Sequence, residues 1–111
     1  MTKFVATQNK GFGITFKNGF TISVQWGTFN YCEKKNLGAD IEEEIKTRRW
    51  ESSNAEIAVF GKDEGFVSLG KDDAVIGWVS PDNVAKCISI VQSSTTEKEI
   101  ETKIKSLNIC Y

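Results

Sequence analysis

Apolar and polar residues alternate most regularly near the amino terminus, and this pattern predicts a β-hairpin. Large apolar residues occupy every second position in residues 12–16 and again in 20–26, which is typical of strands with one buried face. A three-residue loop at 17–19 would set Phe16 opposite Phe20 and keep the large apolar side chains on one face. A two-residue loop at the Asn-Gly pair would set apolar residues against polar ones. Because a buried face fixes the register, we expect the three-residue loop.

Residues 55–79 show a similar pattern and predict a meander of three strands. Two similar turns, "GKDEG" at 61–65 and "GKDDA" at 70–74, divide this segment. The first and last strands, "AEIAVF" and "AVIGWV", are apolar at nearly every position, which indicates strands in the centre of a sheet or covered by helices. The sequence "KFVAT" at 3–7 is a candidate for one further strand, at the edge of the sheet.

The carboxyl-terminal third predicts two amphipathic helices. The first begins with Ser80 as N-cap and Pro81 at the first helical position, and the second begins at Thr96, with Glu99 completing a capping box. The residues expected to face the core are Val84, Cys87, Ile88 and Val91, with Ala85 beside them, in the first helix, and Ile100, Ile104 and Leu107 in the second. Strands followed by helices indicate an α+β fold. We expect one domain over residues 1–111, a twisted antiparallel sheet of about five strands with the two helices packed on it.

Residues 27–54 lack the strand pattern. Within them, "LGADIEEEIKTRRW" contains Asp40 as a candidate N-cap, with acidic residues early and basic residues late, as helices often have. Its apolar stripe is thin, so residues 40–49 form either a short peripheral helix or an ordered loop.

Composition and charge narrow the range of partners. The net charge is -1 and the positive residues are scattered, so the field that attracts nucleic acid or an anionic membrane is weak. The sequence shows neither a signal-peptide core nor a run of eighteen apolar residues, and its three cysteines have no framework spacing, which fits a reducing compartment. We therefore expect a cytoplasmic protein without a membrane partner, with nucleic acid disfavoured. A small homo-oligomer is compatible with this composition.

The lack of histidine limits the chemistry. It excludes Ser-His-Asp triads, Cys-His dyads and histidine metal sites. Cys32 is the natural candidate nucleophile, because Lys34 and Lys35 follow it closely and could activate its thiol. No general base is evident, so packing beneath the turn is the favoured interpretation of Cys32, and Cys87 is assigned to the core. We expect no metal site and no cofactor.

Aromatic residues are the remaining candidates for a site. Trp26 continues the buried row of the hairpin and Trp78 lies in an apolar strand, so both are expected in the core. Phe29, Tyr31 and Trp50 lie in segments without a strand pattern. Large rings in such segments either line a binding cleft or close the end of the sheet. The candidate binding residues are Phe29, Asn30, Tyr31, Cys32 and Trp50.

The segments "SVQWGTFNYC", "SSNAEIAVFG" and "VIGWVSPDNVAKCISIV" together are similar to a family of small, mainly phage-encoded proteins of uncharacterised function. The similarity covers most of the chain in order. In that family the corner is often Gly-Pro-Gly-Asn-Tyr-Cys, whereas Thr28 and Phe29 here replace the proline and the second glycine. The resemblance assigns no catalytic residues. It implies a phage accessory protein that binds a host protein or a small molecule in the host cytoplasm.

These observations predict a small non-enzymatic binding protein, which acts on a host protein or sequesters a nucleotide-like ligand. Two alternatives stay open. One is an enzyme that uses Cys32 or carboxylates of residues 27–50, and the other is a structural or assembly component of a virion.

Overall fold

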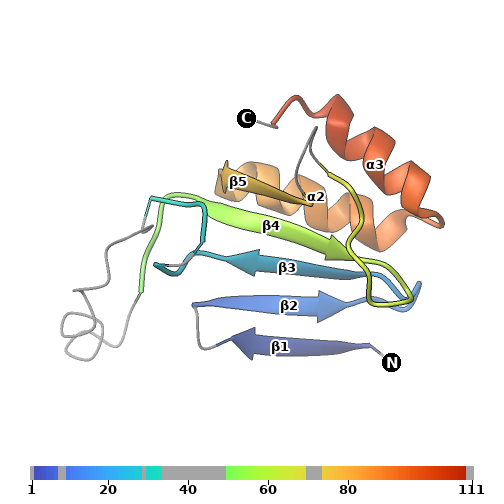
Figure 1. Cartoon of the computed structure of the whole chain (residues 1–111), viewed down its shortest axis with the longest axis horizontal. Helices are drawn as coiled ribbons and strands as arrows, with labels where there is room; N and C mark the ends of the chain where they lie inside the picture. The colour runs from blue at the N-terminus through green and yellow to red at the C-terminus, as the bar shows by residue number, and fades with distance from the viewer. Residues whose placement is uncertain (1, 8–9, 29, 34–49, 70–73, 110–111) are drawn as a thin grey trace.

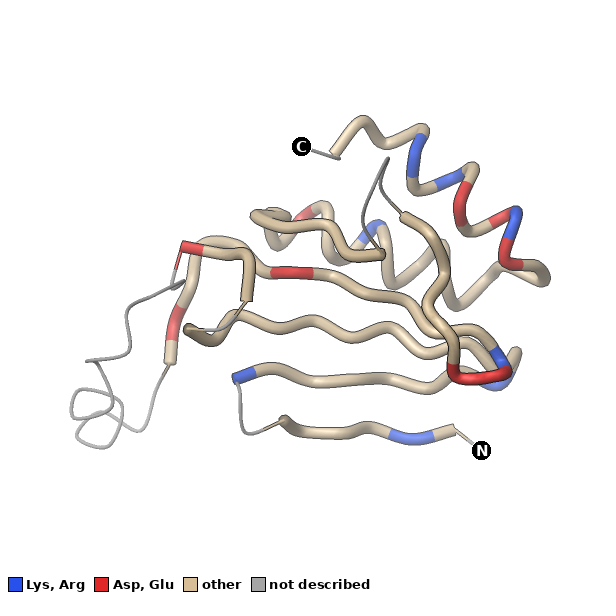
Figure 2. Tube along the Cα trace, in the orientation of Figure 1, with Lys and Arg blue, Asp and Glu red and all other residues tan. Residues whose placement is uncertain are grey.

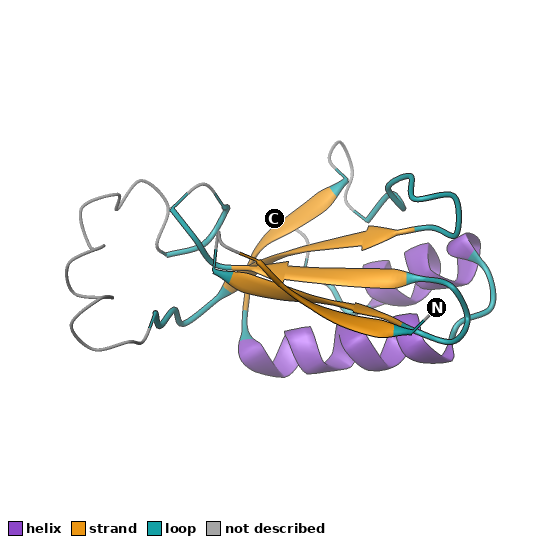
Figure 3. Cartoon of the chain, turned by 90° about the horizontal axis from the view of Figure 1, so that it is seen from below, coloured by secondary structure: helices purple, strands orange, loops and turns teal. Residues whose placement is uncertain are grey.

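The computed structural model describes residues 2–7, 10–28, 30–33, 50–69 and 74–109. These ranges contain the strands β1 (Lys3–Thr7), β2 (Gly11–Thr15), β3 (Thr21–Gln25), β4 (Ala55–Phe60) and β5 (Val75–Val79), and the helices α2 (Pro81–Ser93) and α3 (Glu97–Ser106). The strands form one antiparallel sheet in the order β1-β2-β3-β4-β5. Both helices lie on the same face of it (Figures 1 and 3). The predicted α+β fold is therefore confirmed, whereas the choice between helix and loop at 40–49 lies outside the described residues.

The β2–β3 hairpin has the register that its buried face predicts. Ile14 pairs with Ile22, and the backbone N–H of Phe16 donates to the carbonyl of Phe20 at 2.9 Å. Gly19 closes the loop with a φ of 92°, a left-handed conformation that glycine adopts without a side-chain clash. The three-residue loop is therefore confirmed.

The chain after β4 differs from the predicted meander. β4 pairs directly with β5, whereas residues 66–69 make only a single bridge, to the end of β4. Because β5 occupies the rest of that edge of β4, residues 66–69 leave the sheet, and Val67 and Leu69 are buried in the core. β1, the candidate edge strand, supplies the fifth strand. Residues 70–73, in the second predicted turn, lie outside the described ranges.

β4 and β5 differ in burial although both are apolar in sequence. β4 lies between β3 and β5 and has buried residues on both faces, as predicted. On β5, Ile76 pairs with Ile57 and Val79 with Ala55, so β5 has one residue more than β4 between these pairs, which is a β-bulge. Trp78 lies in this bulge with a φ of 53°, and it is 46% exposed. The prediction of Trp78 as a core residue is wrong, because the extra residue in the bulge directs its side chain away from the buried face of β5.

Both predicted helices are present and begin at the predicted caps. Ser80 Oγ accepts a hydrogen bond from Asn83 N–H at 3.3 Å, and Thr96 Oγ1 accepts one from Glu99 N–H at 3.1 Å. Of the residues expected to face the core, Cys87, Val91, Ile100 and Ile104 are buried and Val84, Ile88 and Leu107 are partly buried. Ala85 is exposed, so its predicted place beside the core is wrong. One residue corresponds to about 100° around a helix, which takes Ala85 from the edge of the stripe into solvent.

Asn18, in the β2–β3 loop, joins the sheet to the carboxyl end of α2. Its Nδ2 donates to the carbonyls of Val91 and Ser94 at 2.8 Å each, and to that of Gln92 at 3.2 Å. Its Oδ1 accepts from the N–H of Phe20 at 3.1 Å. The last carbonyls of a helix have no partner within the helix, so the Asn18 side chain supplies donors that the end of α2 lacks.

The carboxylate of Glu99 links the first turn of α3 to the residue before its N-cap through hydrogen bonds. Its Oε2 accepts from Lys103 Nζ at 2.7 Å, and its Oε1 accepts from the backbone N–H of Thr95 at 2.9 Å. A standard capping box would bond to Thr96, the N-cap itself. The hydrogen bond from Lys103, followed by that from Thr95, lowers the pKa of Glu99 to about 2.

The hydrophobic core lies between the helices and the middle of the sheet. Ile22, Val24, Ile57 and Val59 face the helices from β3 and β4 and are fully buried. Phe4 of β1 lies on the same side as Ile14, its pairing partner, but is 83% exposed because the helices do not reach β1 (Figure 1). No described helix covers the opposite face, here called the helix-free face, where small and hydroxyl-bearing residues such as Thr15, Thr21, Ser23 and Ala58 pair across the strands.

Candidate ligand-binding pocket

The corner after β3 folds back over the helix-free face of β4. Asn30 Oδ1 accepts from the N–H of Gly27 at 3.0 Å, and its Nδ2 donates to Glu56 Oε1 at 3.2 Å. The other oxygen of Glu56 accepts from the N–H of Tyr31 at 2.9 Å. Asn30 is therefore engaged in holding the corner on β4.

Cys32 packs beneath this corner, as the favoured interpretation expects. It is only 1% exposed, and its Sγ lies 3.5 Å from the carbonyl of Gly27. Cys87 is also buried, in the core. A buried thiol has no room for an approaching substrate, so this structure offers no support for Cys32 as a nucleophile.

Tyr31 lies at the outer edge of β5, beside the bulge. Its carbonyl accepts from the N–H of Trp78 at 2.8 Å, and the two rings are 5.6 Å apart. A Cβ on Gly77 would lie 2.6 Å from Tyr31 Cβ, so glycine at this position permits the close approach. Tyr31, 43% exposed, and Trp78 form an aromatic pair at the surface.

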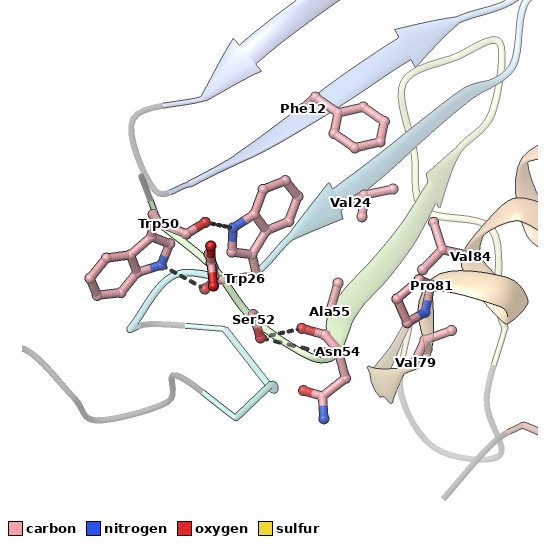
Figure 4. A pocket seen from close by; sticks show the side chains of 11 residues that line it. Phe12, Val24, Trp26, Trp50, Ser52, Asn54, Ala55, Val79, Pro81 and Val84 are labelled. Carbon is pink, nitrogen blue, oxygen red and sulfur yellow. Dashed lines mark hydrogen bonds between the residues drawn. The ribbon is translucent and has the colours of Figure 1, made fainter. Parts of the chain in front are cut away.

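Trp50 pairs with Trp26 through two reciprocal hydrogen bonds (Figure 4). Trp26 Nε1 donates to the carbonyl of Trp50, and Trp50 Nε1 donates to the carbonyl of Trp26, both at 3.0 Å. Trp26 also contacts Phe12 edge to face, with ring centroids 6.1 Å apart. Trp26 is thus half-buried at the margin of the core rather than within it.

These aromatic residues border a pocket of about 490 Å³ on the helix side of the sheet. In Figure 4 the two tryptophans lie at one end, Pro81 and Val84 of α2 lie at the other, and Ala55 lies between them. The lining residues are Phe12, Val24, Trp26, Trp50, Glu51, Ser52, Asn54, Ala55, Val79, Pro81 and Val84. The volume and the mostly apolar walls are typical of sites for small organic molecules.

The polar side chains Ser52 and Asn54 of the pocket are hydrogen-bonded within the protein. Ser52 Oγ donates to the carbonyl of Asn54 at 2.6 Å, and Asn54 Oδ1 accepts from the N–H of Glu33 at 2.7 Å. Among the described lining residues the only ionisable one is Glu51. In the described part of the chain, acidic and basic residues are mixed along α3 and around the turn at 61–65 (Figure 2). None of the described lining residues carries a positive charge.

The structure separates the five residues that the sequence suggested for binding. Trp50 lines the pocket, whereas Asn30, Tyr31 and Cys32 belong to the corner over the helix-free face. Phe29 lies outside the described residues. Sequence reasoning missed the other walls of the pocket, which come from β2, β3, β4, β5 and the start of α2; the only signal was the row of apolar residues ending at Trp26.

Comparisons with protein-family models, curated proteins and solved structures give no match to this chain. The resemblance to small phage proteins therefore stays a prediction. Within the described residues, no helix is both long and apolar enough to cross a membrane, and no three His, Cys, Asp or Glu residues gather as metal ligands would.

Proposed function

We propose that this protein binds a small planar aromatic molecule in the pocket beside Trp26 and Trp50. The observation that carries this proposal is the pocket itself, about 490 Å³ in volume and walled by aromatic and aliphatic side chains from several elements. Such a cavity releases water when it receives an apolar ring, which favours binding.

The hydrogen bonding of the two tryptophans supports an aromatic ligand. Each indole N–H already donates to the carbonyl of the other residue, so the rings offer apolar and π surface rather than donors. Planar rings prefer offset stacking or edge contacts with such surfaces. An aromatic molecule such as a nucleobase fits this chemistry better than a sugar with many hydroxyl groups.

The nucleotide-like ligand expected from the sequence would place its base in this pocket. The described walls are mostly aromatic and aliphatic, with Glu51 as the only charged residue among them. These walls suit the flat apolar faces of a nucleobase. Binding of a host protein, which the resemblance to phage proteins suggests, stays a prediction.

Titration with indole and with adenosine tests the proposal. The three tryptophans give separate indole N–H signals in nitrogen-15 correlated NMR spectra. We expect the signals of Trp26 and Trp50 to shift on binding. The signal of Trp78 should not shift, because its exposed ring packs on Tyr31 and does not line the pocket. Fragments of this size bind with a Kd of ~0.1–1 mM.

Two neighbouring substitutions on α2 provide the control. Val84→Phe fills the pocket from the first turn of the helix and should abolish the shifts, whereas Ala85→Phe places the same ring on the exposed side and should leave them unchanged. The proposal is wrong if neither ligand shifts the two indole signals at millimolar concentration. It is also wrong if Val84→Phe binds as tightly as Ala85→Phe.

A further inference from the structure

The pairing of β2 determines which backbone groups of β1 face outward. Just beyond the ends of β2, the N–H of Phe16 donates to the carbonyl of Phe20, and the carbonyl of Lys10 accepts from the N–H of Trp26. Phe20 and Trp26 flank β3. Even-numbered residues of β2 therefore direct their backbone groups to β3. Because successive residues alternate, the odd-numbered residues of β2 direct theirs to β1.

On β1, the same alternation leaves two residues with outward-facing backbone groups. Lys3, Val5 and Thr7 pair with the odd-numbered residues of β2, so their N–H and C=O groups point into the sheet. The N–H and C=O groups of Phe4 and Ala6 consequently point away from it. No described strand lies on this side of β1 (Figure 1).

This edge lacks the usual protection of exposed strands. Natural edge strands are commonly short, bulged, charged or interrupted by proline, whereas β1 is regular over its five residues and its only charged residue is Lys3. Phe4 is 83% exposed and Val5 is 42% exposed. A large apolar ring beside unpaired backbone groups is a surface suited to receive another strand.

We propose that a second copy of this chain pairs with β1, antiparallel and about a two-fold axis at Val5. In this register Phe4 lies opposite Ala6 of the second copy, and Ala6 lies opposite its Phe4. Both pairs direct their backbone groups toward each other, so each forms two hydrogen bonds and the interface contains four. The two five-stranded sheets become one continuous sheet of ten strands.

The side chains of β1 complement themselves in this register. The large ring of Phe4 faces the small side chain of Ala6, Val5 faces Val5, and Lys3 faces Thr7, so no like charges oppose one another. Moving the axis to Phe4 would set two rings against each other and place Thr7 beyond the first residue of β1 in the second copy. The net charge of -1 opposes association only weakly. This two-fold complementarity favours a second copy over an unrelated strand.

The proposed dimer also extends the apolar surface next to the pocket. Ala6 pairs with Phe12, which lines the pocket. Phe4 of the second copy would lie opposite Ala6, two strands away from Phe12, or about 10 Å. The dimer nevertheless does not depend on ligand binding, and each proposal is tested separately.

A cysteine at the two-fold axis tests the register. Val5 and its counterpart would form a non-hydrogen-bonded pair with Cα atoms about 4.5 Å apart, within the range that a disulfide requires. In a Cys110→Ser background, where Cys32 and Cys87 are buried, Val5→Cys should form a covalent dimer on mild oxidation. Thr7→Cys should stay largely monomeric, because its side chain would face Lys3.

Sedimentation of the unmodified chain tests the association itself. We expect a reversible dimer as the concentration rises toward the millimolar range. Phe4→Ser should weaken the dimer about tenfold, since its contact with Ala6 occurs twice by symmetry. Phe66→Ser should not change the dimer, because this exposed phenylalanine pairs with Phe60 at the end of β4, away from β1. A strict monomer at millimolar concentration, or equal cross-linking of Val5→Cys and Thr7→Cys, would overturn the proposal.

Discussion

Replacing Asn18 tests how strongly the β2–β3 loop stabilises the end of α2. Asn18→Ala removes the donors to Val91 and Ser94, both at 2.8 Å, and the acceptor for Phe20 at 3.1 Å. The longer bond to Gln92 is exposed, so water replaces it at little cost.

The expected loss of stability follows from these three bonds. A hydrogen bond contributes about 0.5–1.5 kcal/mol, and a partly buried carbonyl without a donor costs more than an exposed one. We expect Asn18→Ala to lower the free energy of unfolding by about 2–3 kcal/mol. This lies below the total of about 5–15 kcal/mol that is usual for a domain, so the variant should still fold.

Asn18→Asp separates the effect of the hydrogen bonds that the Asn18 side chain donates from the effect of its size and shape. The introduced carboxylate keeps an acceptor for Phe20 but cannot donate, and it brings a negative charge to the negative end of a helix dipole. At pH 7 we expect Asn18→Asp to be less stable than Asn18→Ala by a further ~0.3–1 kcal/mol. Below pH ~4 the carboxyl becomes protonated and regains a donor, so the difference should shrink.

Urea unfolding followed by circular dichroism measures these effects. With an m value of about 1–2 kcal/mol/M, the midpoint of Asn18→Ala should fall by about 1–3 M. Lys17→Ala, at an exposed residue of the same loop, is the control and should leave the midpoint almost unchanged. A loss below about 0.5 kcal/mol for Asn18→Ala, or an Asn18→Asp protein as stable as Asn18→Ala at pH 7, would refute this account.

Three further predictions concern the corner, the start of α3 and the cysteines. Gly77→Ala should lower the free energy of unfolding by about 1–3 kcal/mol in urea titrations, because its Cβ would lie 2.6 Å from Tyr31 Cβ. Glu99→Gln should be less stable than the unmodified chain at neutral pH, and the difference should fall as the pH drops from about 4.5 toward 2. The sign follows from the pKa of Glu99, which the hydrogen bond from Lys103 lowers to about 2 in the folded state. The ionised carboxylate stabilises the folded state fully above the pKa of the unfolded chain, and this stabilisation is lost as the pH falls through the pKa of the folded state. Cys32 is 1% exposed and should react with thiol reagents only after unfolding. Mass spectrometry of the native protein after labelling measures this.

The predictions for Gly77 and Glu99 each have a matched control. Gly65→Ala places its Cβ 3.4 Å from Asp63 Oδ1, the end of a side chain, and should be tolerated better than Gly77→Ala. Glu101→Gln also removes an i,i+4 pair, with Lys105 at 3.2 Å, but no backbone contact at the helix start. It should therefore show little of the pH dependence. Rapid labelling of Cys32 in the folded chain would contradict the packed corner.

Local sequence patterns were sufficient where the cause of a structure lies within a few residues. The alternation from 12 to 26 needs only one buried face to define the hairpin register, and that register is the observed one. Ser80 and Pro81 define the start of α2 through the geometry of the first helical turn. The strands-then-helices order likewise predicts the α+β fold. Each of these features depends on periodicity or on a cap, which a single segment already contains.

Tertiary structure decided the features that depend on residues far apart in the chain. In the sequence Asn18 has the pattern of a simple turn residue, and only folding brings its side-chain amide to the carbonyl of Val91. Trp78 reads as core, and only pairing with β4 creates the bulge that exposes it. The predicted binding residues divide for the same reason: Glu56 holds Asn30 on one face of the sheet, while the other face builds the pocket that includes Trp50. A local pattern shows which residues are apolar or polar, but their partners depend on strand order and helix placement, which are properties of the whole fold.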